Sequence, residues 1–266
     1  MANGKFGAKE VMDVTLYDMV TGRPVITFDT LKTSSIEFTT EKVDARGGKG
    51  NPKLITWELN KEGTLTIEDA LLSTKSFELI SGLATTKGKQ VIPVRQRNEY
   101  DTTGTTPVDK GSSYPLTADE NGKITLAYAP VDAVENIFVY EHDKDCEEAV
   151  DMTGATLNGK ELTIASVAGK KVIVYYNFET TDTAETYVID SSHFAGTYKM
   201  VGTTFVRNAD TKDDEPFTVI IPNLKWTSNL NLELTADGDP STTTFECEIL
   251  RSANSDEMIK MIKHEG

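Results

Sequence analysis

The stretch ARGGKGNPKLITWE, residues 45–58, brings three glycines and two lysines directly before a segment rich in apolar residues. That segment, KLITWEL (53–59), alternates its side chains between two faces, as a strand does. The preceding SSIEFTTEKV (34–43) also alternates apolar and polar residues. Two alternating segments joined by glycine-rich residues predict a β-hairpin whose tip is the glycine stretch.

The glycine-rich tip does not match a nucleotide-binding loop. A P-loop ends in Gly-Lys-Ser/Thr and leads into a helix, whereas Gly48-Lys49 is followed by Gly50 and a strand. Two interpretations remain open: a flexible tip without function, or a loop that becomes ordered only against a partner subunit. In the second, the subunit-interface residues are Arg46, Gly47, Gly48, Lys49, Gly50 and Asn51.

Composition excludes several classes of protein. With 42 acidic and 27 basic residues the net charge is −15, so the surface as a whole does not attract nucleic acid. The two cysteines, Cys146 and Cys247, are too few for a disulfide framework, and we expect free thiols. No apolar stretch matches a signal peptide or a membrane span. We therefore expect synthesis in a reducing cytoplasm, without a membrane partner.

The distribution of charge predicts an inserted domain. Acidic and basic residues number 13 and 14 in residues 1–100, 16 and 6 in 101–185, and 13 and 7 in 186–266. The acidic middle is bounded by the polar, Thr-rich stretches EYDTTGTTPVDKGSSYP and ETTDTAET. We predict a discontinuous body, residues 1–100 and 186–266, with an acidic domain of residues 101–185 inserted into one of its loops.

Both parts have the patterns of β structure, with one helical interruption. Four segments of the middle alternate or are continuously apolar: KITLAYA (123–129), NIFVYEH (136–142), ATLNGKELTI (155–164) and KKVIVYYNF (170–178). Asn158-Gly159 is predicted to form the centre of a type I′ hairpin turn. The middle resembles a small immunoglobulin-like β-sandwich. In the body, residues 66–82 predict a helix with Thr66 as N-cap and Gly82 as its end.

Few residues indicate chemistry. EHDKDCEE (141–148) could hold a divalent cation, but an exposed acidic loop has the same pattern and is the preferred interpretation. His193 follows Ser191 and Ser192, but neighbours on a strand point to opposite faces and no G-x-S-x-G motif is present. We predict no enzyme, no catalytic residue, no metal site and no cofactor.

Three segments resemble the major tail tube proteins of tailed bacteriophages, and the resemblance skips the acidic middle. They are DARGGKGNPKLITWELNKEGTLTIEDALLSTKSFELISG (44–82), FAGTYKMVGTTFVRNADTKDDEPFTVIIPNLKW (194–226) and LTADGDPSTTTFECEILR (234–251). The resemblance implies a β-sandwich or barrel with a flanking helix, an added immunoglobulin-like module, and stacked rings, usually hexameric. It also implies a tube in the virion tail for DNA ejection, with other copies, other tail proteins and a sheath as partners.

A tube has a lumen, and one strand offers candidates to line it. In residues 34–43, Ile36, Phe38 and Thr40 are predicted to face the core. The opposite face then carries the candidate lumen residues Glu37, Thr39 and Glu41. Negative side chains there would let DNA pass without binding. An ordinary solvated face explains the same pattern.

Two other classes of protein remain open. One is another phage structural component, such as a capsid decoration protein. The other is a carbohydrate-binding or adhesive β protein that uses the inserted domain. A binding platform needs exposed aromatic rings, whereas the candidate tyrosines lie within predicted strands, where core packing accounts for some of them: Tyr128, Tyr140, Tyr175 and Tyr176.

Overall fold

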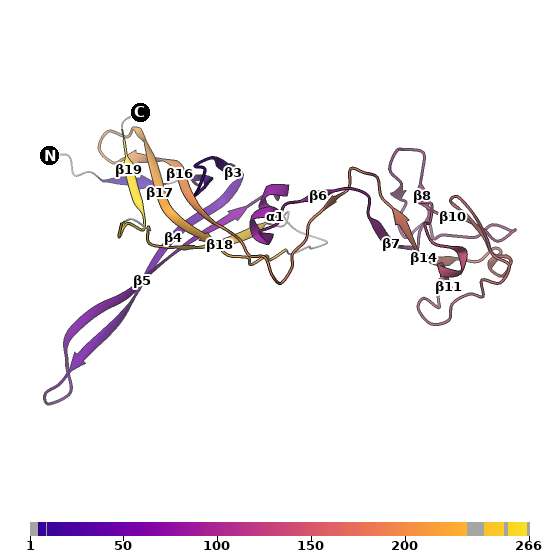
Figure 1. Ribbon diagram of the computed structural model, residues 1–266, viewed down its shortest axis with the longest axis horizontal. Coiled ribbons are helices and arrows are strands. Elements are labelled where there is room, and N and C mark those ends of the chain that lie inside the picture. The colour runs from indigo at the N-terminus through magenta and orange to yellow at the C-terminus, as the bar shows by residue number, and fades with distance from the viewer. Residues whose placement is uncertain (1–4, 9, 233–241, 253–254, 265–266) are drawn as a thin grey trace. The chain divides into compact units, whose positions relative to one another are not determined.

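The computed structural model of the chain describes residues 5–8, 10–232, 242–252 and 255–264. The chain forms two compact units (Figure 1): unit 1 comprises Met1–Thr85 and Tyr187–Gly266, and unit 2 comprises Thr86–Thr186. Residues 91–96, which the sequence analysis assigns to the body, form a strand of unit 2 because they pair with residues 174–179.

Unit 1 contains one nine-stranded antiparallel sheet. Its strands are β1 (Phe6–Ala8), β2 (Asp13–Asp18), β3 (Pro24–Phe28), β4 (Leu31–Arg46), β5 (Lys53–Asp69), β16 (Thr197–Asn208), β17 (Asp214–Trp226), β18 (Thr243–Ile249) and β19 (Lys260–Lys263). The order is β3-β2-β16-β17-β18-β5-β4, with β1 beside β16 and β19 beside β17. Over the residues described, this path ends at β3 and β4 and does not close into a barrel.

The core of unit 1 lies on one face of this sheet. β18, TTFECEI, alternates buried and exposed side chains along its whole length, as period-2 geometry requires. Trp226 stacks on Phe28 at 5.7 Å between ring centroids and contacts Phe245 at 5.3 Å. The helix α1 (Thr74–Ser81) adds Leu79 and Ile80 to this core. The prediction of a mainly β fold with a flanking helix is thus confirmed.

The predicted start of the helix is wrong, although its predicted end is correct. Thr66 is no N-cap, because residues 63–69 still belong to β5 and pair with β18. The N-cap is Ser73, whose Oγ accepts the backbone N–H of Ser76 at 3.1 Å. Gly82 ends the helix with φ +70°, the left-handed conformation that glycine adopts without strain.

Unit 2 is built from short strands and two single-turn 3-10 helices. Its strands are β6 (Thr86–Lys87), β7 (Val91–Gln96), β8 (Tyr100–Asp101), β9 (Val108–Asp109), β10 (Lys123–Thr125), β11 (Phe138–Glu141), β12 (Thr156–Asn158), β13 (Glu161–Thr163), β14 (Val172–Glu179) and β15 (Glu185–Thr186). Two three-stranded sheets, β11-β14-β7 and β10-β13-β12, share one apolar core that includes Val139, Val174 and Leu162. The immunoglobulin-like character of this unit remains a proposal.

The predicted turn at Asn158-Gly159 is displaced by one residue. Asn158 pairs with Glu161, so the two central residues are Gly159 and Lys160. Only Gly159 has a positive φ, +58°. A two-residue turn with glycine first is the II′ type, whose twist also matches the paired strands. The sequence signal located the hairpin, but register with β13 placed its turn.

A buried polar network supports the core of unit 2. Gln96 is fully buried, and its Oε1 accepts the backbone N–H of Ala127 at 2.9 Å. The Tyr176 hydroxyl donates to the same oxygen at 3.1 Å and accepts the N–H of Tyr128 at 3.2 Å. Burial raises the pKa of Tyr176 to about 12. Tyr176 is therefore a core residue and not part of a binding platform.

Candidate functional site

The outer half of the β4–β5 hairpin is a long exposed part of unit 1. Every residue of β5 from 53 to 62 is exposed, whereas from Gly63 onward alternate residues are buried. The change coincides with the end of β18, whose last partner on β5 is Gly63. Pairing with β4 is irregular between Thr39 and Glu41. We call residues 41–59, beyond this irregularity, the arm; Figure 1 shows it extending away from the sheet.

One face of the arm is mostly apolar, with one carboxylate, Glu41, directly opposite Leu59 at its inner end. Residues directly opposite in an antiparallel pair share a face, and Val43 lies opposite Trp57 and Ala45 opposite Ile55. The four large apolar side chains of this face are each about half exposed: Val43 50 %, Ile55 52 %, Trp57 49 % and Leu59 49 %. In contrast, the apolar residues at alternate positions farther along β5, Leu65 and Ile67, are fully buried. Exposed apolar faces are typical of interaction surfaces, and a partner for this one is proposed below.

The other face of the arm is mostly charged. Lys53 Nζ lies 2.8 Å from Asp44 Oδ2, and the Thr56 hydroxyl donates to Asp44 Oδ1 at 2.8 Å. The hydrogen bond from Lys53, with that from Thr56, lowers the pKa of Asp44. Lys42 and Glu58 form a second cross-strand pair at 3.5 Å. These contacts hold the ribbon together in water while its apolar face stays uncovered.

The tip of the arm has a defined backbone. The Asn51 N–H donates to Gly48 O at 3.0 Å, and the Gly47 N–H donates to Pro52 O at 3.2 Å. Gly48 and Gly50 have φ of +85° and +88°, and Asn51 has φ +50°. Glycine is needed at these two positions for the turn itself. The structure places all six predicted interface residues, 46–51, together here; whether they bind a partner subunit stays a prediction.

The three candidate lumen residues are exposed, but the irregularity divides them. Glu37 and Thr39 lie on the body side of it, opposite Thr64 and Glu62. Glu41 lies on the arm, where it accepts a hydrogen bond from Asn60 Nδ2 at 2.7 Å. The three residues are therefore not one regular row, and a role in lining a lumen stays a prediction.

The strand face predicted to point inward is buried only in part. Ile36 packs against the core of unit 1. Phe38 remains 37 % exposed, and its ring lies over Gly63, where a Cβ would approach it to 2.6 Å. The core therefore thins out toward the arm.

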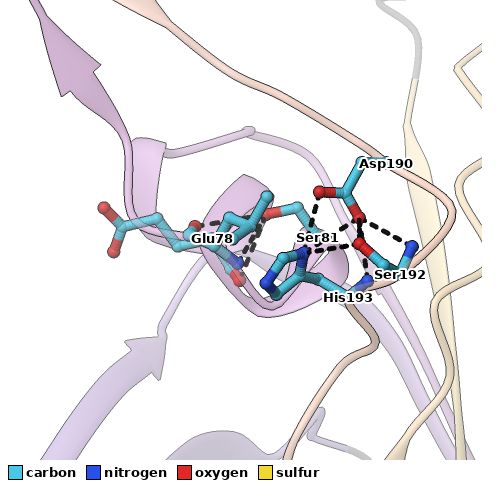
Figure 2. Close-up of polar contacts among 6 residues, drawn as sticks. Glu78, Ser81, Asp190, Ser192 and His193 are labelled. Carbon is cyan, nitrogen blue, oxygen red and sulfur yellow. Dashed lines mark hydrogen bonds and ion pairs between the residues drawn. The ribbon is translucent and has the colours of Figure 1, made fainter.

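Asp190, Ser192 and His193 come together, but their geometry is not that of a catalytic triad (Figure 2). His193 Nδ1 lies 2.8 Å from Asp190 Oδ2 and 3.2 Å from Ser192 Oγ. A relay needs the serine and the carboxylate on opposite ring nitrogens. Asp190 also accepts the N–H groups of Ser192 and His193 at 2.8 Å, and these bonds lower its pKa to about 2. The cluster is a capped turn.

The acidic segment 141–148 is likewise used structurally. Arg95 donates to Asp145 at 2.6 Å and to the Tyr175 hydroxyl at 2.9 Å. Arg97 donates to His142 Nε2 at 3.2 Å. Among the residues that the structure describes, no group of three or more His, Cys, Asp or Glu side chains is arranged to hold a metal ion.

A mainly β fold with an exposed, two-faced arm is typical of structural β proteins. The family model of the YomU/Tube protein family matches residues 6–263, and the chain belongs to this family of phage-associated tube proteins. No curated protein matches the sequence. Within the described ranges, no helix is both long and apolar enough to cross a membrane.

The family match extends the resemblance seen in the sequence. It runs through the acidic middle, which the three resembling segments skip. The first part of the third segment, 234–241, lies outside the described residues. The resemblance to phage tube proteins is confirmed at the level of the family, and the chain is a structural component of a phage tail.

Proposed function

We propose that this chain polymerises into stacked, six-membered rings that form the tail tube, through which DNA passes during ejection. The observation that carries the proposal is the apolar face of the arm, where the described part of the subunit leaves four large side chains about half exposed: Val43, Ile55, Trp57 and Leu59. A polymer contact removes these side chains from water, at about 25 cal/mol per Å² of apolar surface. The tip residues 46–51 are the polar end of the same contact.

Ring formation uses the open edges of the sheet. β3 and β4 stand at the two ends of the strand order, and unpaired edges bind further strands readily. Pairing of one copy's edge with its neighbour's joins the sheets around a central channel. In that arrangement Glu37 and Thr39 belong to the channel side, and repulsion between the Glu37 carboxylate and phosphate keeps DNA from binding.

Unit 2 is proposed to be an immunoglobulin-like module outside the polymerising body. The chain leaves unit 1 after Thr85 and returns at Tyr187. The two crossings are adjacent, because the residues next to them, Thr86 and Thr186, pair with each other in β6 and β15. Deletion of residues 88–184 with a short Gly/Ser bridge should leave a soluble body that still assembles. A deletion variant that cannot fold would contradict this division of the chain.

Electron microscopy tests the function directly. Purified protein at rising concentration should form rings and hollow rods in negative stain, and sedimentation should show material larger than a monomer. Dispersed monomers at all concentrations would contradict a tube and favour a decoration or adhesive protein. Part of the attraction should weaken with salt, since the tip is basic and the chain is acidic overall.

A further inference from the structure

Five large apolar residues of β5 stand at odd positions. On the arm they are Ile55, Trp57 and Leu59, and in the sheet they are Leu65 and Ile67. Unbroken alternation would place all five side chains on one face of the strand. In the structure the first three are about half exposed, whereas the last two are fully buried. The cause lies between Leu59 and Leu65.

A β-bulge reverses the alternation of β5 at this point. Two successive pairs of the β4–β5 ladder are Thr39 with Glu62 and Glu41 with Leu59. Between these pairs β4 has one residue, whereas β5 has two, Asn60-Lys61. One extra residue on one strand of a pair is a β-bulge. Beyond it the residues of the longer strand point to the opposite face, so the odd residues of β5 change sides here.

The sequence of β4 fits this bulge. In the sheet its apolar residues are even, Ile36 and Phe38, whereas on the arm they are odd, Val43 and Ala45. The extra residue lies on β5, so β4 itself alternates without interruption and its two apolar sets lie on opposite faces. The apolar face of the arm is therefore on the side of β4 that carries Glu37 in the sheet, away from the core of the subunit.

A regular ladder without the bulge would slip the arm by one residue. Val43 would then lie opposite Glu58, and Asp44 opposite Trp57, so each face would mix apolar and charged side chains. The observed register instead pairs Lys42 with Glu58 at 3.5 Å and keeps the apolar residues together. The slipped ladder would also turn Trp57 toward the core side of the sheet.

Asn60 makes the bulge possible. Its φ is +49°, in the left-handed region, which asparagine adopts more readily than most residues and β-branched residues rarely adopt. Its Nδ2 also donates to Glu41 Oε2 at 2.7 Å across the ribbon. From Gly63 onward the ladder is held by pairing with β18 and by the buried Leu65. A substitution at position 60 that disfavours the bulge therefore shifts the register of the arm.

We infer that the bulge at Asn60-Lys61 determines the side of the sheet on which the arm contacts the next copy. The inference rests on the proposed function, because it gives a direction to the contact made by the apolar face of the arm. With the bulge, this face points away from the subunit's own core, and copies meet on the side that carries Glu37. In the slipped register the same side chains point the other way, and this contact is lost. Asn60 is thus a positioning residue.

Cross-strand disulfides report the register in the monomer. Cysteines directly opposite each other can form a disulfide, whereas cysteines on opposite faces point apart. Cys146→Ser removes the exposed thiol, and Cys247 is buried. In this background, Val43→Cys should form a disulfide with Trp57→Cys and not with Glu58→Cys. With Asn60→Val added, the preference should reverse. An unchanged preference would overturn the inference, because position 60 would then not control the register.

Deletion of Lys61 provides the matched rescue. It removes the extra residue, so that a regular ladder keeps Val43 opposite Trp57 and no residue has to be left-handed. Asn60→Val alone should raise the concentration needed for assembly about tenfold. The same variant with Lys61 deleted should assemble as the parent does. Sedimentation across a concentration series measures both, and the circular dichroism spectrum of each monomer should match that of the parent.

Three results would overturn the inference and leave the proposed function standing. They are normal assembly of the Asn60→Val variant, a defect that deletion of Lys61 does not repair, and loss of the folded circular dichroism spectrum in the Asn60→Val monomer, which would place position 60 in the core. Absence of rods from the unmodified protein would reject the proposed function and the inference with it.

Discussion

The two halves of β5 form a comparison within one strand. From Gly63 to Asp69, alternate side chains are buried and the strand is paired on both sides, by β4 and β18. From Lys53 to Glu62 the strand pairs, among the described residues, only with β4, and every side chain is exposed. The apolar residues are similar in both halves: Leu65 and Ile67 are fully buried, whereas Ile55 and Leu59 are about half exposed. The same residue types thus stabilise the fold in one half and are available for assembly in the other.

Truncation of matched isoleucines gives the largest expected difference. Ile67→Ala removes a fully buried side chain, and should lower the free energy of unfolding of unit 1 by about 2–5 kcal/mol. Ile55→Ala should change it by no more than about 0.5 kcal/mol, because the arm is outside the core. Urea unfolding of the monomer, followed by tryptophan fluorescence, measures both. Similar losses from the two variants would show that the arm belongs to the core.

A charge on the apolar face of the arm should affect assembly and not folding. Trp57→Asp should raise the concentration needed for polymerisation at least tenfold, equivalent to about 1.4 kcal/mol per contact. The circular dichroism spectrum of the monomer should stay unchanged. Sedimentation across a concentration series provides the measurement. Thr56→Asp is the control, because Thr56 lies opposite Asp44 on the charged face, and it should assemble nearly as the parent does; equal defects in the two variants would reject a face-specific contact.

Alanine substitutions of the tip glycines should differ in how much they destabilise the turn. Gly48→Ala forces a side chain into φ +85°, at a local cost of about 1–2 kcal/mol. Gly47 has no positive φ, and a Cβ there would meet only the Leu54 side chain at 3.4 Å. Hydrogen exchange of the Asn51 amide, which donates to Gly48 O, should therefore accelerate in Gly48→Ala and not in Gly47→Ala. Equal exchange in both variants would mean that the turn is not populated in solution.

Acidification should destabilise the pairing of the arm, and this is the smallest of the expected effects. The hydrogen bond from Lys53 lowers the pKa of Asp44 in the folded arm. The carboxylate therefore favours the folded arm at any pH above its ordinary value of 3.8, and this contribution is lost as the pH falls through the lowered value. Amide exchange along 41–59 should then rise on acidification without a matching change in 63–69. Asp44→Asn should abolish this pH dependence; an unchanged dependence would assign it to another group.

Much of the fold was accessible from local patterns. Period-2 alternation predicted the hairpin around residues 45–58, and Gly82 marked the end of the helix because its left-handed conformation is a local property. The predicted helix start was wrong because residues 65–69 also fit a helical pattern. These residues form a strand instead, because they pair with residues 243–247 of β18. The turn after Asn158 moved by one residue for the same reason, since register depends on the partner strand.

The candidate site also has features that the sequence predicts and features that depend on tertiary packing. The sequence by itself determined the β class, the hairpin and its glycine tip, because alternation and turn chemistry depend on neighbours in the chain. It could not show that Trp57 is exposed and Ile67 buried, since both look like ordinary strand residues. Only the tertiary structure decided this, by ending β18 opposite Gly63. It also brought the backbone of Phe194 against Gly82 at the end of α1, although the two residues are more than a hundred positions apart in the chain. Burial is a property of the packed whole, and no local pattern encodes it.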